Sequence, residues 1–359
     1  QITLKWPSDN MTFGYTGQAL AEYQYALVVA TDGNQLVGQD KLESGNITYT
    51  FTEEGGGSVK SPIAVGTYTV TPTPGSDPWM KNYDFDYPAS GTITITQSTS
   101  ATLTVIPKVA EGLIYSGAPQ NLLTGLTVTV SDGSTIDADE YQVHYSVGDA
   151  AAESDPGTIP TGTDAGNYTV HYLVTSTNYQ DATGQIVVTI GRKDLTITRT
   201  LTDTKTYDGT NGLSEAQLQE LNSSLQVTGA VDGEKDDITV KVTGSPTYDS
   251  ATAGEDKTIT ITYTLTAEGD TNLRNYQVKI GEGEPEEISE EKTCSVEEEV
   301  QGKIEKASVT VTVSDQSSVY DGTEPKVNQE QGDSSDPKAW HITEGELFNS
   351  DTLGVTLSI

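Results

Sequence analysis

Apolar and polar residues alternate with a period of two along many short stretches of the chain. In each stretch Ile, Val or Leu takes every second position and Thr takes most of the others. The clearest examples are residues 92–96, 127–130, 195–198, 238–242, 258–263 and 309–313. Such alternation is typical of strands with one face in a core and one in water. Turn residues rich in Gly and Asp separate the stretches. The pattern therefore predicts an ordered all-β chain rather than the disorder that so acidic a composition also allows.

One stretch predicts a helix. Ser214 is a suitable N-cap, and Leu218 and Leu221 follow three residues apart. This spacing puts both leucines on one side of a helix of one or two turns over residues 214–221.

Three short motifs recur in the same order along the chain. The first combines Tyr with a Gly two positions later, at Tyr15-Thr16-Gly17, Tyr115-Ser116-Gly117, Tyr207-Asp208-Gly209-Thr210 and Tyr320-Asp321-Gly322-Thr323. The second is Gly66-Thr67-Tyr68-Thr69-Val70 and Gly166-Asn167-Tyr168-Thr169-Val170, with a looser form between Gly254 and Leu265. The third is an Asn-Tyr pair, at Asn82-Tyr83, Asn178-Tyr179 and Asn275-Tyr276. We call these the opening, middle and closing motifs.

The order of the motifs predicts repeated modules. We expect complete modules at residues 1–106, 107–191 and 192–306, and part of a fourth at 307–359. The Gly of the opening motif suits a turn with positive φ, and Tyr and Val of the middle motif share one face of a strand. We interpret the motifs as structural, the alternative being a platform of exposed tyrosines for sugars.

Modules of this size with several strands and no long helix suit an immunoglobulin-like β-sandwich. A β-grasp-like module is the alternative, because each module has room for a short helix. Cys294 is the single Cys, which excludes an intramolecular disulfide. The junctions carry no Pro-rich or Gly/Ser-rich linker, so we expect adjacent modules to form a fairly stiff, monomeric rod.

These motifs resemble known repeats. The Tyr-Asp-Gly-Thr openings, the Asp164–Val170 run, the Asn-Tyr closings and the I-x-K-A-x-V-T-V run at Ile304–Val311 resemble the YDG- and MBG-type repeats of large bacterial extracellular proteins. Residues 107–191 are similar to the Ig-like repeats of Gram-positive gut surface proteins. The resemblance implies wall-attached or secreted proteins whose repeats serve as stalks or adhesive modules.

Charge narrows the possible partners. The chain has 19 Lys and Arg against 53 Asp and Glu, a net charge of −34. Nucleic acid and anionic membranes both require a basic surface, so neither is an expected partner. No apolar run is long enough for a transmembrane helix. Residues 281–300 hold nine Glu and one Lys, which predicts an acidic insertion forming a mobile loop or an extended hairpin.

No set of residues suits catalysis. His144 and His171 lie in strand-like stretches without a partnered nucleophile, and the many paired carboxylates, such as Asp84 and Asp86, follow from composition. We expect a protein that is not an enzyme and binds no organic cofactor. Calcium is the ligand that the acidic loops suit best, and Asp137, Asp139 and Glu140 are the candidate ligands.

The expected function is therefore a non-catalytic stalk or adhesive region of a bacterial cell-surface or cell-wall protein. Two alternatives remain. The modules could bind a host glycan or host protein through loops such as 41–60, 147–163 and 271–300. They could also be accessory modules of a larger carbohydrate-active enzyme.

Overall fold

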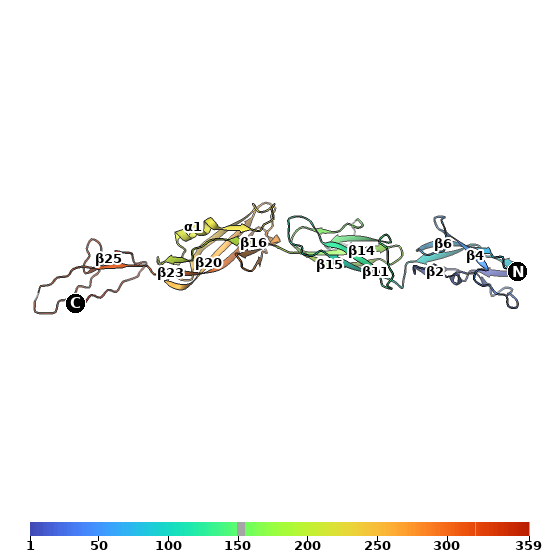
Figure 1. Cartoon of the computed structure of the whole chain (residues 1–359), viewed down its shortest axis with the longest axis horizontal. Coiled ribbons are helices and arrows are strands. Elements are labelled where there is room, and N and C mark those ends of the chain that lie inside the picture. Colours follow the sequence, from blue (N-terminus) through green and yellow to red (C-terminus); the bar gives the residue numbers. More distant parts are fainter. Residues whose placement is uncertain (149–154, 320, 359) are drawn as a thin grey trace. The chain divides into compact units, whose positions relative to one another are not determined.

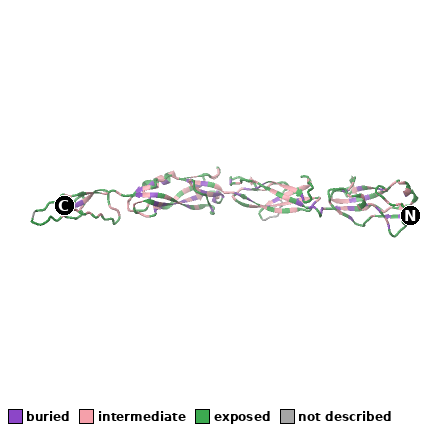
Figure 2. Ribbon diagram, turned by 60° about the horizontal axis from the view of Figure 1, so that its bottom comes forward, coloured by how far each residue is buried: buried purple, intermediate pink, exposed green. Residues whose placement is uncertain are grey.

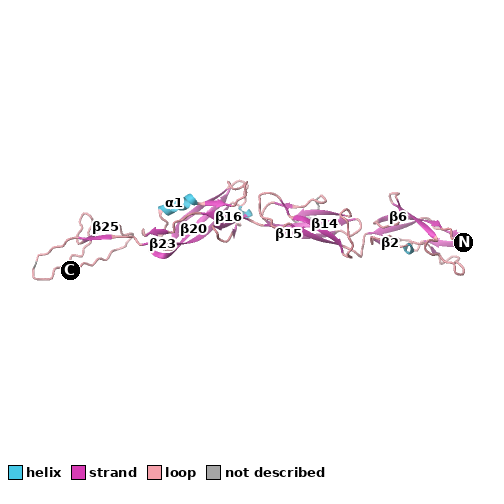
Figure 3. Cartoon of the chain, in the orientation of Figure 1, coloured by secondary structure: helices cyan, strands magenta, loops and turns pink. Residues whose placement is uncertain are grey.

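The computed structural model describes residues 1–148, 155–319 and 321–358. It divides into two compact units. Unit 1 contains residues 1–113, 119–162 and 167–190, and unit 2 contains residues 114–118, 163–166 and 191–359. Strands make up most of the ordered elements (Figure 3), and the described residues contain a single α-helix. Among these residues no helix is both long and apolar enough to cross a membrane.

The first part of unit 1 contains two sheets. The larger sheet has the strand order β2-β8-β6-β4-β5. Its strands are β2 (Met11–Gly14), β4 (Ile47–Glu53), β5 (Ser58–Val59), β6 (Gly66–Pro74) and β8 (Gly91–Thr96). The smaller sheet, β3-β1-β7, consists of β1 (Ile2–Lys5), β3 (Val28–Val29) and β7 (Phe85–Asp86). Two 3-10 turns, η1 (Glu22–Gln24) and η2 (Pro78–Asn82), complete this part.

The middle motif packs as the alternation predicts. Tyr68 and Val70 of β6 are buried, while Thr69 between them is exposed. They join a core of buried residues from β2, β4 and β8, namely Met11, Phe51, Ile93 and Ile95, with Tyr25 beside them. A second apolar cluster lies under the smaller sheet, around Ile2, Leu4 and Met80.

In the second part of unit 1 the described residues form strands as their regular elements. They are β9 (Leu103–Val109), β10 (Gln120–Asn121), β11 (Leu123–Val130), β12 (Tyr141–Val147), β13 (Thr161–Gly162), β14 (Gly166–Ser176, whose first residue belongs to unit 2) and β15 (Ala182–Ile190). They pair as β11-β9, β10-β13 and β12-β14-β15. Buried, intermediate and exposed positions are mixed along these ribbons (Figure 2), with regular alternation along β15, and Val170, Val188 and Ile190 lie in the core.

Unit 2 contains two four-stranded sheets, with orders β18-β16-β21-β22 and β17-β23-β20-β19. Figure 1 labels β16, β20 and β23 among these strands. The first has β16 (Lys193–Thr198), β18 (Gln226–Thr228), β21 (Tyr276–Ile280) and β22 (Glu286–Glu287). The second has β17 (Thr204–Thr206), β19 (Ile238–Tyr248), β20 (Gly254–Ala267) and β23 (Thr293–Glu305). The 3-10 turn η3 (Leu273–Asn275) leads into β21.

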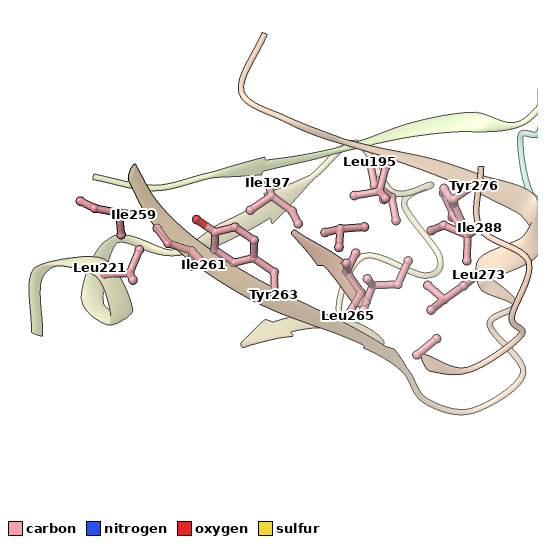
Figure 4. Close-up of a cluster of buried hydrophobic side chains, with 14 of the residues drawn as sticks. Leu195, Ile197, Leu221, Ile259, Ile261, Tyr263, Leu265, Leu273, Tyr276 and Ile288 are labelled. Atoms are coloured by element: carbon pink, nitrogen blue, oxygen red, sulfur yellow. The ribbon is translucent and has the colours of Figure 1, made fainter. Parts of the chain in front are cut away.

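Both sheets contribute to one apolar core. Leu195 and Ile197 come from β16, and Ile261, Tyr263 and Leu265 come from β20. Figure 4 shows these side chains gathered between the strands, and each is fully buried. Two sheets enclosing a common core confirm the predicted all-β sandwich class rather than the β-grasp alternative.

The predicted helix is present and longer than expected. α1 spans Glu215–Ser224. Ser214 caps it by accepting a hydrogen bond from the backbone of Gln217, whose side chain bonds back to Ser214. Leu221 is fully buried and joins the sandwich core. The reciprocal cap explains why a helix forms here in a chain otherwise made of strands.

The acidic stretch at residues 281–300 agrees only in part with the prediction. Its first half forms a short hairpin, in which Glu286–Glu287 of β22 pair with Gln277–Val278 of β21, but its second half belongs to β23, which pairs with β20 from Thr266↔Thr293 onward. Val296 is buried and Glu298 half-buried, whereas Glu297 and Glu299 are exposed. The many glutamates obscure the alternation of this strand in the sequence. One of its faces carries exposed glutamates and the other packs in the core.

Near the C-terminal end, β24 (Thr310–Val313) pairs with β25 (Trp340–Glu344). The opening motif of the predicted fourth module includes Tyr320, which lies outside the described residues. Residues 149–154 of the candidate binding loop 147–163 lie outside them too.

Candidate functional sites: the tyrosine joints

Each of the first three opening tyrosines is fixed to the end of its own repeat. The backbone N–H of Tyr15, Tyr115 and Tyr207 donates to the carbonyl oxygens of Thr96, Gly191 and Glu305 respectively, each at 2.8 Å. Two residues later Gly17, Gly117 and Gly209 have φ values of 74°, 75° and 78°. This left-handed conformation favours Gly, as the sequence predicted, and it makes the chain turn sharply after the tyrosine.

The rings of these tyrosines contact an aromatic ring of the following repeat. Tyr15 meets Tyr179 with ring centroids 5.5 Å apart and planes at 85°. Tyr115 meets Tyr276 at 5.4 Å and 79°. These edge-to-face pairs are a favourable aromatic geometry. Tyr179 and Tyr276 are the tyrosines of closing motifs, so we call the two contacts the first joint and the second joint. The first lies wholly in unit 1 and the second wholly in unit 2.

The asparagines of the second and third closing motifs bind residues just before the middle motif of the preceding repeat. Asn178 Oδ1 accepts a hydrogen bond from the backbone of Val65 at 3.4 Å. Asn275 Oδ1 accepts from the backbone of Ala165 at 2.8 Å, and its Nδ2 donates to Asp164 at 3.0 Å. Val65 and Ala165 each directly precede the Gly of a middle motif. All three motifs therefore meet at the joints.

An acidic side chain completes the second joint. Glu234 accepts hydrogen bonds from the hydroxyls of both Tyr115 and Tyr276, the latter at 2.6 Å. The hydroxyl of Tyr276 also accepts from the backbone N–H of Val231 at 3.2 Å. Burial and the bond to Glu234 raise the pKa of Tyr115 and of Tyr276 far above the ordinary tyrosine value. Both phenols therefore stay neutral and serve as donors.

The predicted calcium ligands lie beside the first joint. Glu140 caps its own loop by accepting from the backbone of Asp137 at 3.0 Å, and Asn178 donates to it at 3.5 Å. Burial chiefly, with smaller contributions from Tyr179 and Glu140, raises the pKa of Tyr15. Asp137 and Asp139 are exposed. Across residues 1–148, 155–319 and 321–358 no three His, Cys, Asp or Glu side chains converge as metal ligands. Calcium binding therefore stays a prediction.

A third contact uses other residues. Tyr207 meets Phe348 at 5.7 Å and 86°, and its hydroxyl donates to Asp351 at 2.8 Å. Asn349 Nδ2 donates to the carbonyl of Gly209 at 2.7 Å. A cavity of about 280 Å³ lies beside Tyr207 and Phe348, so this contact is less completely filled with side chains.

A buried lysine holds the Tyr-Asp-Gly-Thr turn of the third repeat. Lys205 Nζ donates to Asp208 at 2.8 Å, to the carbonyl of Thr210 at 3.0 Å and to that of Gly212 at 2.7 Å. Asp208 also accepts from the backbone of Thr210 at 2.9 Å. Burial alone would raise the pKa of Asp208, but the bonds from Lys205 and Thr210 hold it below its ordinary value. Tyr207 is thereby presented from a fixed turn.

The remaining residues considered for chemistry, His144, His171 and Cys294, lie on strands. His171 lies on β14, where its Nε2 contacts the carbonyl oxygen of Gly148 at 2.7 Å. His144 lies opposite Leu173 in the pairing of β12 with β14. Cys294 is half-buried against the sandwich core, and burial raises the pKa of its thiol. A thiol with a raised pKa is a poor nucleophile at neutral pH.

Sequence reasoning found the motifs but assigned each of them to its own module. It did not predict that the opening and closing tyrosines of successive repeats contact each other. The one available signal for these contacts was the fixed order of the motifs. Along the chain, the closing motif of each later repeat comes after the opening motif of the repeat before it.

Residues 191–283 match the family model of the YDG domain. Among solved structures, the protocadherin gammaB7 EC3-6 cis-dimer is similar at 10% identity and a TM-score of 0.22, covering 90% of this chain and 77% of that chain. Protocadherin gamma B7 extracellular cadherin domains 1-4 are similar at 12% identity and a TM-score of 0.22, covering 84% and 76%. Scores this low support no structural or functional conclusion. No curated protein matches the chain.

Proposed function

We propose that the chain is a spacer made of repeat modules, in which each tyrosine joint holds the opening turn of one repeat against the closing motif of the next. The modules are residues 1–106, 107–191 and 192–306, with part of a fourth at 307–359. The observation that carries the proposal is the burial of the second joint, where Tyr115 is 4% and Asn275 is 3% exposed. Side chains that are buried and fully hydrogen-bonded in this way resist independent movement of the elements they connect.

The YDG match and the repeated motifs point to structural or binding modules rather than an enzyme. In the proposal these modules form a monomeric stalk of a bacterial extracellular or cell-surface protein. Such a stalk would carry other parts of the protein away from the cell. The large net negative charge of −34 would keep it soluble and would oppose association of neighbouring copies.

Small-angle X-ray scattering of the full chain tests this proposal. We expect a monomer whose scattering fits one arrangement of the modules, and a broader ensemble once Tyr15→Ala and Tyr115→Ala remove both joints. Tyr23→Ala is the matched control, because Tyr23 is 82% exposed and belongs to no joint. A compact globule, or identical curves for the wild-type protein and the joint variant, would contradict the proposal.

A further inference from the structure

The N-terminal end of unit 1 carries the same elements that receive a tyrosine in the second joint. β1 pairs with β3 through Leu4↔Val29 and in parallel with β7 through Ile2↔Phe85. β16 pairs in the same manner, through Ile197↔Val227 and Leu195↔Val278. Tyr83 and Tyr276 each stand two residues before the strand partner, and each ends a 3-10 turn. Tyr83 is therefore the structural counterpart of Tyr276.

The hydrogen bonds of Tyr83 agree with this correspondence. Its hydroxyl accepts from the backbone of Val37 at 3.1 Å and donates to Asp40 at 2.8 Å. The hydroxyl of Tyr276 accepts from Val231 and donates to Glu234. In both cases the acid follows the valine by three residues. A valine, an acid and a closing tyrosine thus form the same receiving surface in both places.

The two surfaces differ in whether a turn covers them. Glu234 uses its second oxygen for Tyr115, whereas Asp40 Oδ1 accepts no hydrogen bond from any described residue. Val231 is half-buried and lies under Gly117, whereas Val37 is 68% exposed. Val37 is therefore exposed at the position that the Gly117 turn covers in the second joint.

We infer that the surface formed by Val37, Asp40, Asn82 and Tyr83 docks the Tyr-x-Gly turn of another module of this class, joined to the N-terminal side of β1. The occupied second joint shows what covers such a surface. The tyrosine would pack on Tyr83 and donate to Asp40, and a backbone N–H would meet Asn82. This inference rests on the proposed function, because it extends the same joint by one further module.

A fusion tests the inference. Because Leu195 corresponds to Ile2, residues 107–193 placed directly before Gln1 would reproduce the connection of the second joint. A Cβ at Gly117 would lie 3.8 Å from Val231 Cβ, close to the spacing across a disulfide. We therefore expect Gly117→Cys in the added segment and Val37→Cys to form a disulfide in the Cys294→Ser background. Non-reducing electrophoresis and intact mass report its formation.

Two controls separate the possible failures. In the unextended chain, Gly117→Cys with Val231→Cys should form a disulfide, and its absence would overturn the joint itself and hence the proposed function. In the fusion, Tyr23→Cys in place of Val37→Cys should not form one. If the Val231 pair forms and the Val37 pair does not, only the docking inference fails. Disulfides that appear between chains and rise with concentration would show a second copy as the occupant and would also overturn it.

Hydrogen exchange provides a measurement free of cysteines. In the fusion we expect exchange of the Val37 amide to slow at least tenfold relative to the unextended chain, because docking covers Tyr83. Tyr115→Ala in the added segment should restore the faster rate. An unchanged rate in the fusion would contradict docking, and slower exchange on adding oligosaccharides to the unextended chain would favour a glycan as the occupant instead.

Discussion

Replacing Tyr115 with Phe should destabilise the sandwich of unit 2, although the β16 strand of that sandwich begins only at Lys193. The substitution keeps the ring that contacts Tyr276 and removes only the hydroxyl that donates to Glu234. Hydrogen bonds to charged groups contribute about 1.5–3 kcal/mol, and Glu234 is partly exposed, so water can replace part of the loss. We expect unit 2 to lose about 1–2 kcal/mol of unfolding free energy.

A double-mutant cycle sharpens this prediction. Tyr276→Phe removes the second donor to Glu234 and the acceptor of the Val231 amide, so its effect should exceed that of Tyr115→Phe. Because both hydroxyls share one carboxylate, the double variant should lose less than the sum, with a coupling of about 0.5–1 kcal/mol.

Native-state hydrogen exchange of β16 and β21 is the suitable assay, since each 1.4 kcal/mol changes the exchange rate about tenfold. Tyr15→Phe is the matched control, because Tyr15 lies in unit 1 and should leave unit 2 unchanged. If Tyr115→Phe leaves exchange in β21 at the wild-type rate and the coupling is zero, the reasoning about the joint is wrong.

Further predictions concern unit 2. The raised pKa values of Tyr115 and Tyr276 mean that their contribution to its stability should be fully present below pH 10 and be lost as pH rises above the ordinary tyrosine pKa of 10.0, which denaturation series at several alkaline pH values would show. Lys205→Met should lower the urea midpoint by an amount equivalent to about 2–3 kcal/mol, less than for a fully buried pair because its partner is partly exposed. Arg199→Ala should leave the Glu298 carboxylate without its two-bond partner and lower Tm, with a loss of about 2–3 kcal/mol. An unchanged Tm would contradict the last prediction.

Alternation of Thr with Val or Ile was sufficient to predict β8, β11, β16, β19, β20 and β24, because one buried face fixes a period of two. The opening glycines were predictable for a similar local reason, since their turns require positive φ. The cap at Ser214 was predictable as well. These features depend on residues that are close together in the sequence, and a single sequence shows such local patterns directly.

The acidic strand and the joints were not predictable from local pattern. In β23 the glutamates occupy both faces, and Glu298 is tolerated inside because Arg199 and Tyr263 bond to it. That partnership joins β20, β23 and the residue that follows β16, which periodicity does not reveal. The contact between Tyr15 and Tyr179 likewise joins motifs of different repeats. The repeat period shows where each tyrosine lies in its own module, but it does not show which tyrosine of another module it contacts.

The central claim is that the joints hold successive modules in one arrangement, and a distance measured across the first joint tests it most directly. Spin labels at Thr50→Cys and Thr129→Cys would stand on exposed strand positions of unit 1, in the Cys294→Ser background. Pulsed electron paramagnetic resonance should give one narrow distance distribution, which Tyr179→Ala broadens and Tyr23→Ala leaves unchanged. A distribution that is already broad without Tyr179→Ala, or one that Tyr179→Ala does not alter, would contradict the account.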